Sequence, residues 1–310
     1  MHFPPFQCAL KIRWCLTSAF ALWLAAGDAC AQSAQSRPLQ LQHDDRDRTY
    51  LLYRPESLSR RESVPLVLVL HGGFGSGSQA EQTYRWDQLA DREGFVVVYP
   101  DGVGRSWNAG GMCCGPALRE GVDDAGFLAQ LIETVAKAEN IDRRRVYMTG
   151  MSNGAAMAYR YACEARVTVA AIGPVAGTFS QACPYPKPVS VLAIHGLADQ
   201  NVPFAGGPGT KGVTKGNWLS VEQTLDAFRN ASRCGPAATQ KAGAVQTSTA
   251  HCEQGREIVL MTITNAGHQW PGSAPRSGPL SRLLPVDTPS TAVDATVTLW
   301  AFFRSHPAPP

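Results

Sequence analysis

Ser152 lies at the centre of a Gly-x-Ser-x-Gly sequence, between Gly150 and Gly154. Residues 146–149 alternate as in a strand, and small helix-forming residues follow the serine. A strand, a sharp turn and a helix form a nucleophile elbow, whose strained turn presents the serine hydroxyl clear of the sheet. Glycines two residues to either side remove the Cβ atoms that would block the turn. The pattern predicts a nucleophilic serine, with the N–H of Asn153 placed to bind an oxyanion.

A serine nucleophile needs a histidine base and an acid that orients the histidine, and after such an elbow they follow in the order acid, histidine. His268 follows a late predicted strand in a glycine-flanked loop, whereas His71 and His195 precede the glycines of earlier loops and are expected to brace them. Asp199 lies just past a strand end, between Ser152 and His268. We therefore predict Ser152 as nucleophile, His268 as general base and Asp199 as orienting acid. A turn-forming role is the alternative for Asp199. Three other acids are set aside because they follow the histidine or lie inside a helix, namely Asp226, Asp287 and Asp294.

A glycine-rich loop, residues 71–77, follows the continuous apolar run of residues 64–70. It lacks the Gly-Lys-Ser/Thr ending of a phosphate-binding loop and the spacing of a dinucleotide-binding loop. A plain turn needs fewer glycines. After a central strand and upstream of an elbow, such a loop is placed to supply the second donor of an oxyanion hole. We predict that Gly73 or Phe74 donates its N–H there, beside that of Asn153.

Two tryptophans in predicted loops are candidates for contacting a substrate. Trp107 belongs to a long loop, residues 101–121, and Trp270 follows His268 by two positions. Either ring could stack on an aromatic group. Packing inside the protein is an equal expectation for side chains of this size.

The rest of the chain alternates between strand-like and helix-like segments. Continuous apolar runs predict buried strands, and apolar residues at helical spacing predict helices. Such alternation predicts an α/β fold, with a mostly parallel sheet covered by helices on both faces. Residues 32–48 are expected to be loose, and residues 205–217 to form a surface loop. The predicted strands span residues 48–54, 64–70, 95–100, 146–149, 167–175, 189–194 and 257–264, and the predicted helices span residues 82–92, 122–140, 220–230 and 294–304.

The composition excludes several classes of function. The chain of 310 residues has 28 Lys and Arg against 25 Asp and Glu, so no strongly basic face predicts a nucleic-acid partner or an anionic membrane surface. Asp123 and Asp124 begin the helix at 122–140, where carboxylates complement the helix dipole, and are expected to cap it. No cysteine lies in a Cys-x-x-Cys sequence with partners at zinc-ligand spacing, so we predict no metal site.

Residues 1–31 are typical of a secretory signal. Lys11 and Arg13 form a basic start, and the apolar stretch at 14–26 is shorter than an ordinary membrane span. Small residues precede a cleavage site after Ala31. We predict that the mature chain is secreted or periplasmic, with no integral membrane span.

Cleavage would leave six cysteines, an even number that suggests disulfide bonds in an exported chain. Six cysteines allow fifteen pairings. Four of the cysteines can form two pairs that each close a local loop, and we favour that pairing. The adjacent Cys113 and Cys114 could form a bridge or stay reduced. Cys30 could carry a lipid anchor, but the residues before it form a poor lipidation motif. The predicted pairs are Cys163–Cys183 and Cys234–Cys252.

Taken together, these motifs resemble the secreted esterases grouped as polyhydroxybutyrate depolymerase-like and feruloyl esterase-like proteins of the LpqC type. The resemblance spans about residues 46–304, and the motifs are specific as a set. The stretches that carry it are Leu70–Gly77, Trp107–Gly111, Cys113–Gly115, Val122–Asp124, Gly150–Gly154, His195–Asp199 and Gly267–Gly272.

The resemblance implies a single α/β-hydrolase domain over residues 32–310, a triad of Ser152, Asp199 and His268, and no cofactor. It also implies ester substrates such as hydroxycinnamoyl sugars or short hydroxyalkanoate oligomers. Depolymerases of solid polyester usually append a linker and a binding domain. The chain ends at Pro310 with neither, so we expect soluble esters.

Two other functions stay open at this stage. One is an exported binding or cell-surface protein on a hydrolase scaffold, because a fold does not guarantee activity. The other is a serine peptidase of the same fold, because the triad would be the same. The complete set of candidate residues in the right order disfavours the first, and the lack of a substrate-selecting cap or propeller segment disfavours the second. The oligomeric state is not predicted.

Overall fold

The computed structural model of the chain describes residues 35–309, except residues 112, 165–166, 184–185, 213–216 and 275–286. The predicted secretory signal, with Cys30, lies outside the described residues. Residues 34–310 form one compact unit. Within the part that is described, no helix combines the length and the apolar character needed to cross a bilayer.

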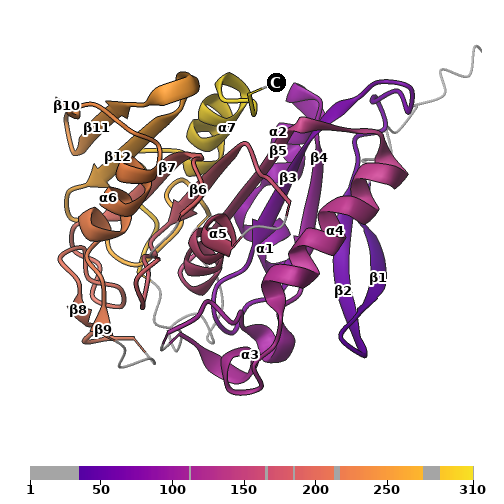
Figure 1. Cartoon of the computed structure of the whole chain (residues 1–310), viewed down its shortest axis with the longest axis horizontal. Coiled ribbons are helices and arrows are strands. Elements are labelled where there is room, and N and C mark those ends of the chain that lie inside the picture. The colour runs from indigo at the N-terminus through magenta and orange to yellow at the C-terminus, as the bar shows by residue number, and fades with distance from the viewer. Residues whose placement is uncertain are drawn as a thin grey trace, which may run out of the picture. The chain divides into compact units, whose positions relative to one another are not determined.

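The described residues form a ten-stranded sheet whose six central strands run parallel, flanked by antiparallel strands at both edges. Figure 1 shows one antiparallel hairpin at each edge. The predicted mostly parallel sheet is therefore confirmed. In spatial order the strands are β1 (Arg37–His43), β2 (Arg46–Tyr53), β4 (Val96–Pro100), β3 (Val64–Leu70), β5 (Ile141–Met151), β6 (Ala171–Val175), β7 (Ser190–Gly196), β12 (Glu257–Ile263), β11 (Val245–His251) and β10 (Ala238–Ala242).

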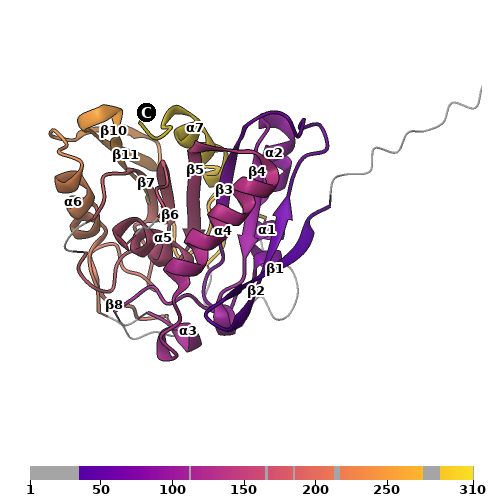
Figure 2. The ribbon, with the colours of Figure 1, turned by 45° about the vertical axis from the view of Figure 1, so that its right-hand side comes forward.

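Helices cover both faces of this sheet, as predicted. The core on one face holds α4 (Asp124–Glu139), α5 (Asn153–Glu164) and α6 (Val221–Ala231) against the sheet. The core on the other face holds α1 (Gly77–Tyr84), α2 (Trp86–Glu93) and α7 (Ala295–Ser305). Figure 2 shows α4 and α5 lying over the central strands. The short helix α3 (Gly115–Arg119) follows β4, close to the carboxyl ends of the parallel strands.

The edge strands are where the sequence prediction fails. The segment expected to be loose contains β1, which pairs with β2, and the hairpin β10–β11 was not predicted. These strands are exposed or half-buried along almost their whole length, so they lack the apolar pattern that marks a buried strand. The predicted surface loop also overlaps a small two-stranded ladder, β8 (Gly207–Pro208) with β9 (Asn217–Trp218).

The helix predicted for residues 82–92 is two helices. Arg85 separates α1 from α2 and has a left-handed backbone, with φ 58°. A guanidinium nitrogen of Arg85 donates to the carbonyl oxygen of Gly272 at 2.6 Å. The break lets Tyr84 stack on Trp270, with ring centroids 4.1 Å apart. A contact with the far end of the chain thus accompanies a turn that the local pattern does not show.

Adjacent acids at the start of α4 have different roles. Asp123 caps the helix by accepting a hydrogen bond from the N–H of Gly126 at 2.9 Å, as predicted. Asp124 is fully buried, and its Oδ1 lies 2.6 Å from a guanidinium nitrogen of the buried Arg48. Burial raises the pKa of Asp124, and the Arg48 charge opposes that rise. Capping is therefore the wrong role for Asp124, which forms a buried ion pair.

Three disulfide bonds connect the six cysteines of the described region. Two of them are the local pairs proposed from the sequence, and the third joins the adjacent residues whose state was left open. The pairs are Cys163–Cys183, Cys234–Cys252 and Cys113–Cys114.

Candidate active site

Ser152 occupies a strained turn between β5 and α5. Its φ of 56° is left-handed, and its N–H donates to the carbonyl oxygen of Val175 at 2.9 Å. A Cβ atom on Gly150 would lie 2.8 Å from the carbonyl oxygens of Gly154 and Leu70. A Cβ atom on Gly154 would lie 2.5 Å from the oxygen of Leu70. Both glycines are therefore required where the elbow passes close to the end of β3.

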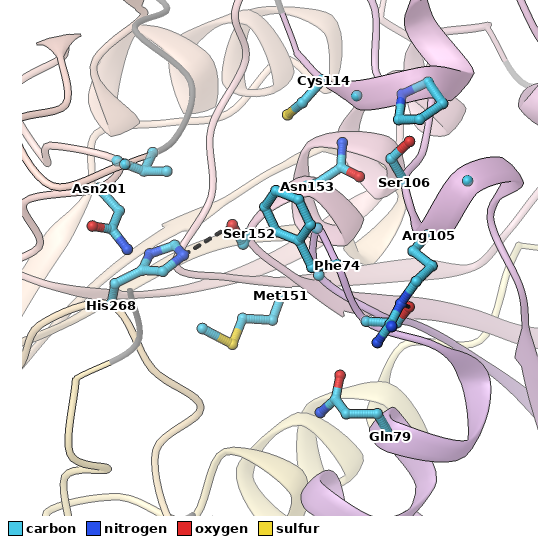
Figure 3. A pocket seen from close by; sticks show the side chains of 18 of the residues that line it. Phe74, Gln79, Arg105, Ser106, Cys114, Met151, Ser152, Asn153, Asn201 and His268 are labelled. Atoms are coloured by element: carbon cyan, nitrogen blue, oxygen red, sulfur yellow. Dashed lines mark hydrogen bonds between the residues drawn. The ribbon is translucent and has the colours of Figure 1, made fainter. Parts of the chain in front are cut away.

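The structure brings the three predicted side chains into one hydrogen-bonded array. The Oγ of Ser152 lies 2.9 Å from Nε2 of His268 (Figure 3). Nδ1 of His268 lies 2.8 Å from Oδ2 of Asp199. Asp199 and His268 are buried. Because a carboxylate only accepts, Nδ1 carries the imidazole proton and leaves Nε2 to accept the serine proton.

The Asp199 carboxylate is held by its own loop as well. Its Oδ1 accepts hydrogen bonds from the N–H groups of Asn201 and Val202, both at 2.9 Å. Burial raises the pKa of Asp199, but the hydrogen bonds from His268 and from the Val202 N–H oppose that rise, and the net pKa lies below its usual value. His195 donates from Nε2 to the carbonyl oxygen of Val202 at 2.9 Å, and burial lowers its pKa. His195 therefore braces this loop as a neutral imidazole, as predicted.

His268 is positioned through its backbone by a residue that sequence reasoning set aside. Oδ2 of Asp287 accepts from the N–H of His268 at 2.8 Å, and the N–H of Asp287 donates to the carbonyl oxygen of His268 at 3.0 Å. A Cβ atom on Gly267 would lie 2.0 Å from the Asp287 carboxylate, so only glycine fits there. The order of the chain excludes Asp287 from the triad, and no sequence signal marks this supporting contact.

Two residues that line the pocket with Ser152 have backbone N–H groups that are candidates for binding an oxyanion. The N–H groups of Gly73 and Asn153 have no backbone acceptor among the described residues. A Cβ atom built on Gly73 would lie 4.0 Å from that of Asn153, so the two residues are neighbours. The N–H of Phe74 donates to the carbonyl oxygen of Arg105 at 2.8 Å. Phe74 is therefore the wrong alternative for the second donor, and Gly73 is the available one.

The loop that carries Gly73 is tied to the elbow through Trp107. The indole N–H of Trp107 donates to the carbonyl oxygen of His71 at 2.9 Å. The amide of Asn153 accepts from the Trp107 N–H at 2.7 Å and donates to the Trp107 carbonyl oxygen at 2.9 Å. His71 itself accepts from the N–H of Gly102 at 3.0 Å, and burial lowers its pKa. Both candidate oxyanion donors thus share one rigid support.

A pocket of about 570 Å³ opens beside Ser152. Neither predicted substrate contact lines it: Trp107 is fully buried, and Trp270 is buried against Tyr84 with its N–H bonded to Thr296. Both therefore pack inside the protein, and the prediction that they bind substrate is wrong. The described residues that line the pocket include Phe74, Tyr84 and Trp218. The sequence analysis named Phe74 only as an oxyanion donor and did not single out the other two.

One group of side chains has the composition of a metal site. Ligand atoms of His43, Asp44 and Asp123 lie within 4.8 Å of one another. Nδ1 of His43 already contacts Gln130 at 2.7 Å, and Asp123 caps α4. These residues are not among those that line the pocket, so they have no part in its chemistry.

Comparison with known proteins identifies the family. Residues 48–194 match the family described as "Esterase PHB depolymerase". The protein named "Putative esterase NocK", from Nocardia uniformis subsp. tsuyamanensis, is 31% identical over 73% of this chain and 72% of its own length. The chain belongs to this esterase family. It is a carboxylic ester hydrolase, as the sequence motifs predicted.

Other relatives of this PHB depolymerase-type esterase are longer proteins. The bifunctional acetylxylan esterase/xylanase XynS20E of Neocallimastix patriciarum is 29% identical over 72% of this chain, which covers 31% of its length. Feruloyl esterase B of Piromyces equi is 25% identical over 69% of this chain, which covers 41% of its length. The chain thus spans less than half of either protein.

Solved structures agree on the fold. The acetyl xylan esterase from Aspergillus awamori has a TM-score of 0.55 at 16% identity, over 78% of this chain and 96% of that one. The feruloyl esterase module from Clostridium thermocellum has a TM-score of 0.52 at 11% identity, over 77% of this chain and 83% of that one. The α/β-hydrolase fold is confirmed.

Proposed function

We propose that this esterase works through an acyl-enzyme formed on Ser152. The observation that carries the proposal is the hydrogen-bonded array of Ser152, His268 and Asp199 at the pocket, which Gly73 and Asn153 also line with N–H groups that have no backbone acceptor among the described residues. Ser152 attacks the ester carbonyl while His268 takes its proton. The N–H groups of Gly73 and Asn153 stabilise the oxyanion.

His268 then gives the proton to the leaving alcohol, and a water activated by the same histidine releases the acid. Asp199 keeps the imidazole in the required tautomer and stabilises its charged form. Its depressed pKa supports this role, because the carboxylate stays ionised through neutral and mildly acidic pH.

The proposed substrates are hydroxycinnamoyl esters or short polyhydroxyalkanoate-type oligoesters. Relatives named as feruloyl and acetylxylan esterases support carbohydrate-linked esters, and the family description supports the oligoesters. The pocket is lined by the aromatic side chains of Phe74, Tyr84 and Trp218, which suit an apolar or planar acyl group. Phe74 is 56% exposed and therefore open to such a contact.

We also propose that the chain is exported, with cleavage after Ala31. Three disulfide bonds support an oxidising compartment. Expression in a bacterial host with a periplasm tests this directly. N-terminal sequencing of the exported protein is expected to begin at Gln32, and retention of the full-length chain in the cytoplasm would contradict the proposal.

A hydrolysis panel on residues 32–310 tests the mechanism. It compares methyl ferulate, a 3-hydroxybutyrate trimer and 4-nitrophenyl acetate, with Ser152→Ala as the control. Turnover that needs Ser152 is expected on at least one ester, and the ratio of kcat/KM values selects the acyl class. Equal activity of both proteins on all three would refute the role of Ser152, and cleavage of peptide substrates instead would favour a peptidase.

A further inference from the structure

The described side chains that line the pocket beside Ser152 carry permanent charge of one sign only. Among the described residues that line it, the permanently charged side chains are Arg105 and Arg119, and no Asp or Glu is one of them. Both arginines are exposed. A substrate entering the pocket therefore meets an apolar surface to which the described residues add positive charge and no compensating carboxylate.

The fold places the two arginines on neighbouring segments. Arg105 ends the short 3₁₀ turn Val103–Arg105, and Arg119 ends α3. The turn packs closely on α3, because a Cβ atom on Gly104 would lie 2.6 Å from the ring of Pro116. The two side chains thus belong to one wall of the pocket, although 13 intervening residues separate them.

Arg105 is anchored at its base with its outer end free. Its Nε donates to the carbonyl oxygen of Gly75 at 3.1 Å, and its own carbonyl oxygen accepts from Phe74. Its two terminal nitrogens have no partner among the described residues. Arg105 and His268 lie on opposite sides of Ser152 in Figure 3. A guanidinium held in this way is oriented before a ligand arrives.

Nearby carboxylates do not neutralise this pair. Glu120, next to Arg119 in the chain, lies 2.9 Å from a guanidinium nitrogen of Arg46. Asp101 accepts from the N–H of Gly77 and from the hydroxyl of Thr49, both at 2.8 Å. Within the described residues, neither Arg105 nor Arg119 forms an ion pair. Their charge is therefore available to a ligand.

We propose that Arg105 and Arg119 form a subsite for a carboxylate carried by the ester substrate, an inference that rests on the proposed esterase function. Guanidinium groups match the two oxygens of a carboxylate. The proposal favours the oligoesters, which end in a carboxylate, over neutral feruloyl esters. The carboxylate could lie on the acyl part of the substrate or on its alcohol part.

Two pairs of substrates separate these arrangements. For the acyl part, the mono-4-nitrophenyl ester of adipic acid is compared with 4-nitrophenyl hexanoate, which has the same number of acyl carbons. For the alcohol part, the 3-hydroxybutyrate dimer is compared with its terminal carboxamide. The quantity measured is the ratio of kcat/KM for the charged ester to that for its neutral partner, at low salt and at 0.5 M salt.

Wild type is expected to favour the charged ester in one of the two pairs. Arg119→Gln and Arg105→Gln should each lower that ratio about 3- to 10-fold, as charge-assisted contacts near the surface predict. High salt should lower it too, because ions screen exposed charges. Arg105→Lys should recover part of the loss. Arg92→Gln removes an exposed arginine of α2 that does not line the pocket and should leave the ratio unchanged.

The proposal fails if wild type shows no preference for the charged ester in either pair, or if the preference survives both arginine substitutions. Arg119 lies at an exposed helix end, so its substitution keeps the test valid even if Arg105→Gln disturbs the loop. Failure of the esterase proposal would give a different result: Ser152→Ala would hydrolyse the neutral esters as fast as wild type does.

Discussion

Replacing Trp107 by phenylalanine should damage catalysis although Trp107 does not line the pocket. The substitution keeps an aromatic ring but removes the N–H that donates to the carbonyl oxygen of His71 at 2.9 Å. That carbonyl begins the loop leading to Gly73, which we propose as an oxyanion donor. Without its tether, the loop can move the Gly73 N–H away from the oxyanion.

Two magnitudes follow from this contact. An orphaned buried carbonyl costs about 1–3 kcal/mol of unfolding free energy. Complete loss of one oxyanion donor slows an enzyme about 10²–10³-fold. Because Gly73 would be displaced and not removed, we expect kcat to fall about 10-fold, with a smaller change in KM.

Trp86→Phe is the matched control. Trp86 is also fully buried, but its indole N–H has no hydrogen-bond partner among the described residues. The same ring volume is lost in both variants, so the cavity cost is similar and the difference isolates the hydrogen bond. Urea denaturation should show Trp107→Phe to be the less stable variant by about 1–3 kcal/mol.

The assay is steady-state hydrolysis of 4-nitrophenyl acetate at 25 °C, where both variants are folded by circular dichroism. We expect Trp86→Phe to stay within about twofold of the wild-type kcat, because it leaves the pocket and its supports in place. Equal kcat values for the two variants would refute the idea that Trp107 supports the oxyanion site.

Three further predictions concern other parts of the molecule. Asp199→Asn should lower kcat about 10⁴-fold in the same ester assay with little change in KM, because the amide would hold His268 in the wrong tautomer; a loss below tenfold would exclude Asp199 as the orienting acid. Burial raises the pKa of Asp87 to about 7, so its contribution to stability falls as pH rises from about 4 to 7. In urea denaturation Asp87→Asn should therefore gain stability relative to wild type over that range and level off above it, and a constant difference would contradict the raised pKa. Replacing both Cys234 and Cys252 by serine should cost about 3 kcal/mol of unfolding free energy, measured in the same way, and leave kcat unchanged; an unchanged midpoint would show that the bridge does not stabilise the fold.

The sequence by itself determined the features that depend on local geometry or on continuous patterns. The glycines around Ser152 are required by the turn itself, so their spacing predicts it. The buried strands were predicted because both of their faces are apolar. Chain order after the elbow then selected Asp199 and His268 from a few candidates, and the structure brings their side chains into contact.

Tertiary structure alone decided which groups are free to act. Nothing near Phe74 in the sequence shows that the carbonyl oxygen of Arg105 takes its N–H and leaves Gly73 as the available donor. Trp107 and Trp270 occupy loops beside the site, yet contacts with His71 and Thr296 turn both indoles inward. Hydrogen-bond partners and exposure depend on residues far away in the chain, and a sequence pattern carries no record of those neighbours.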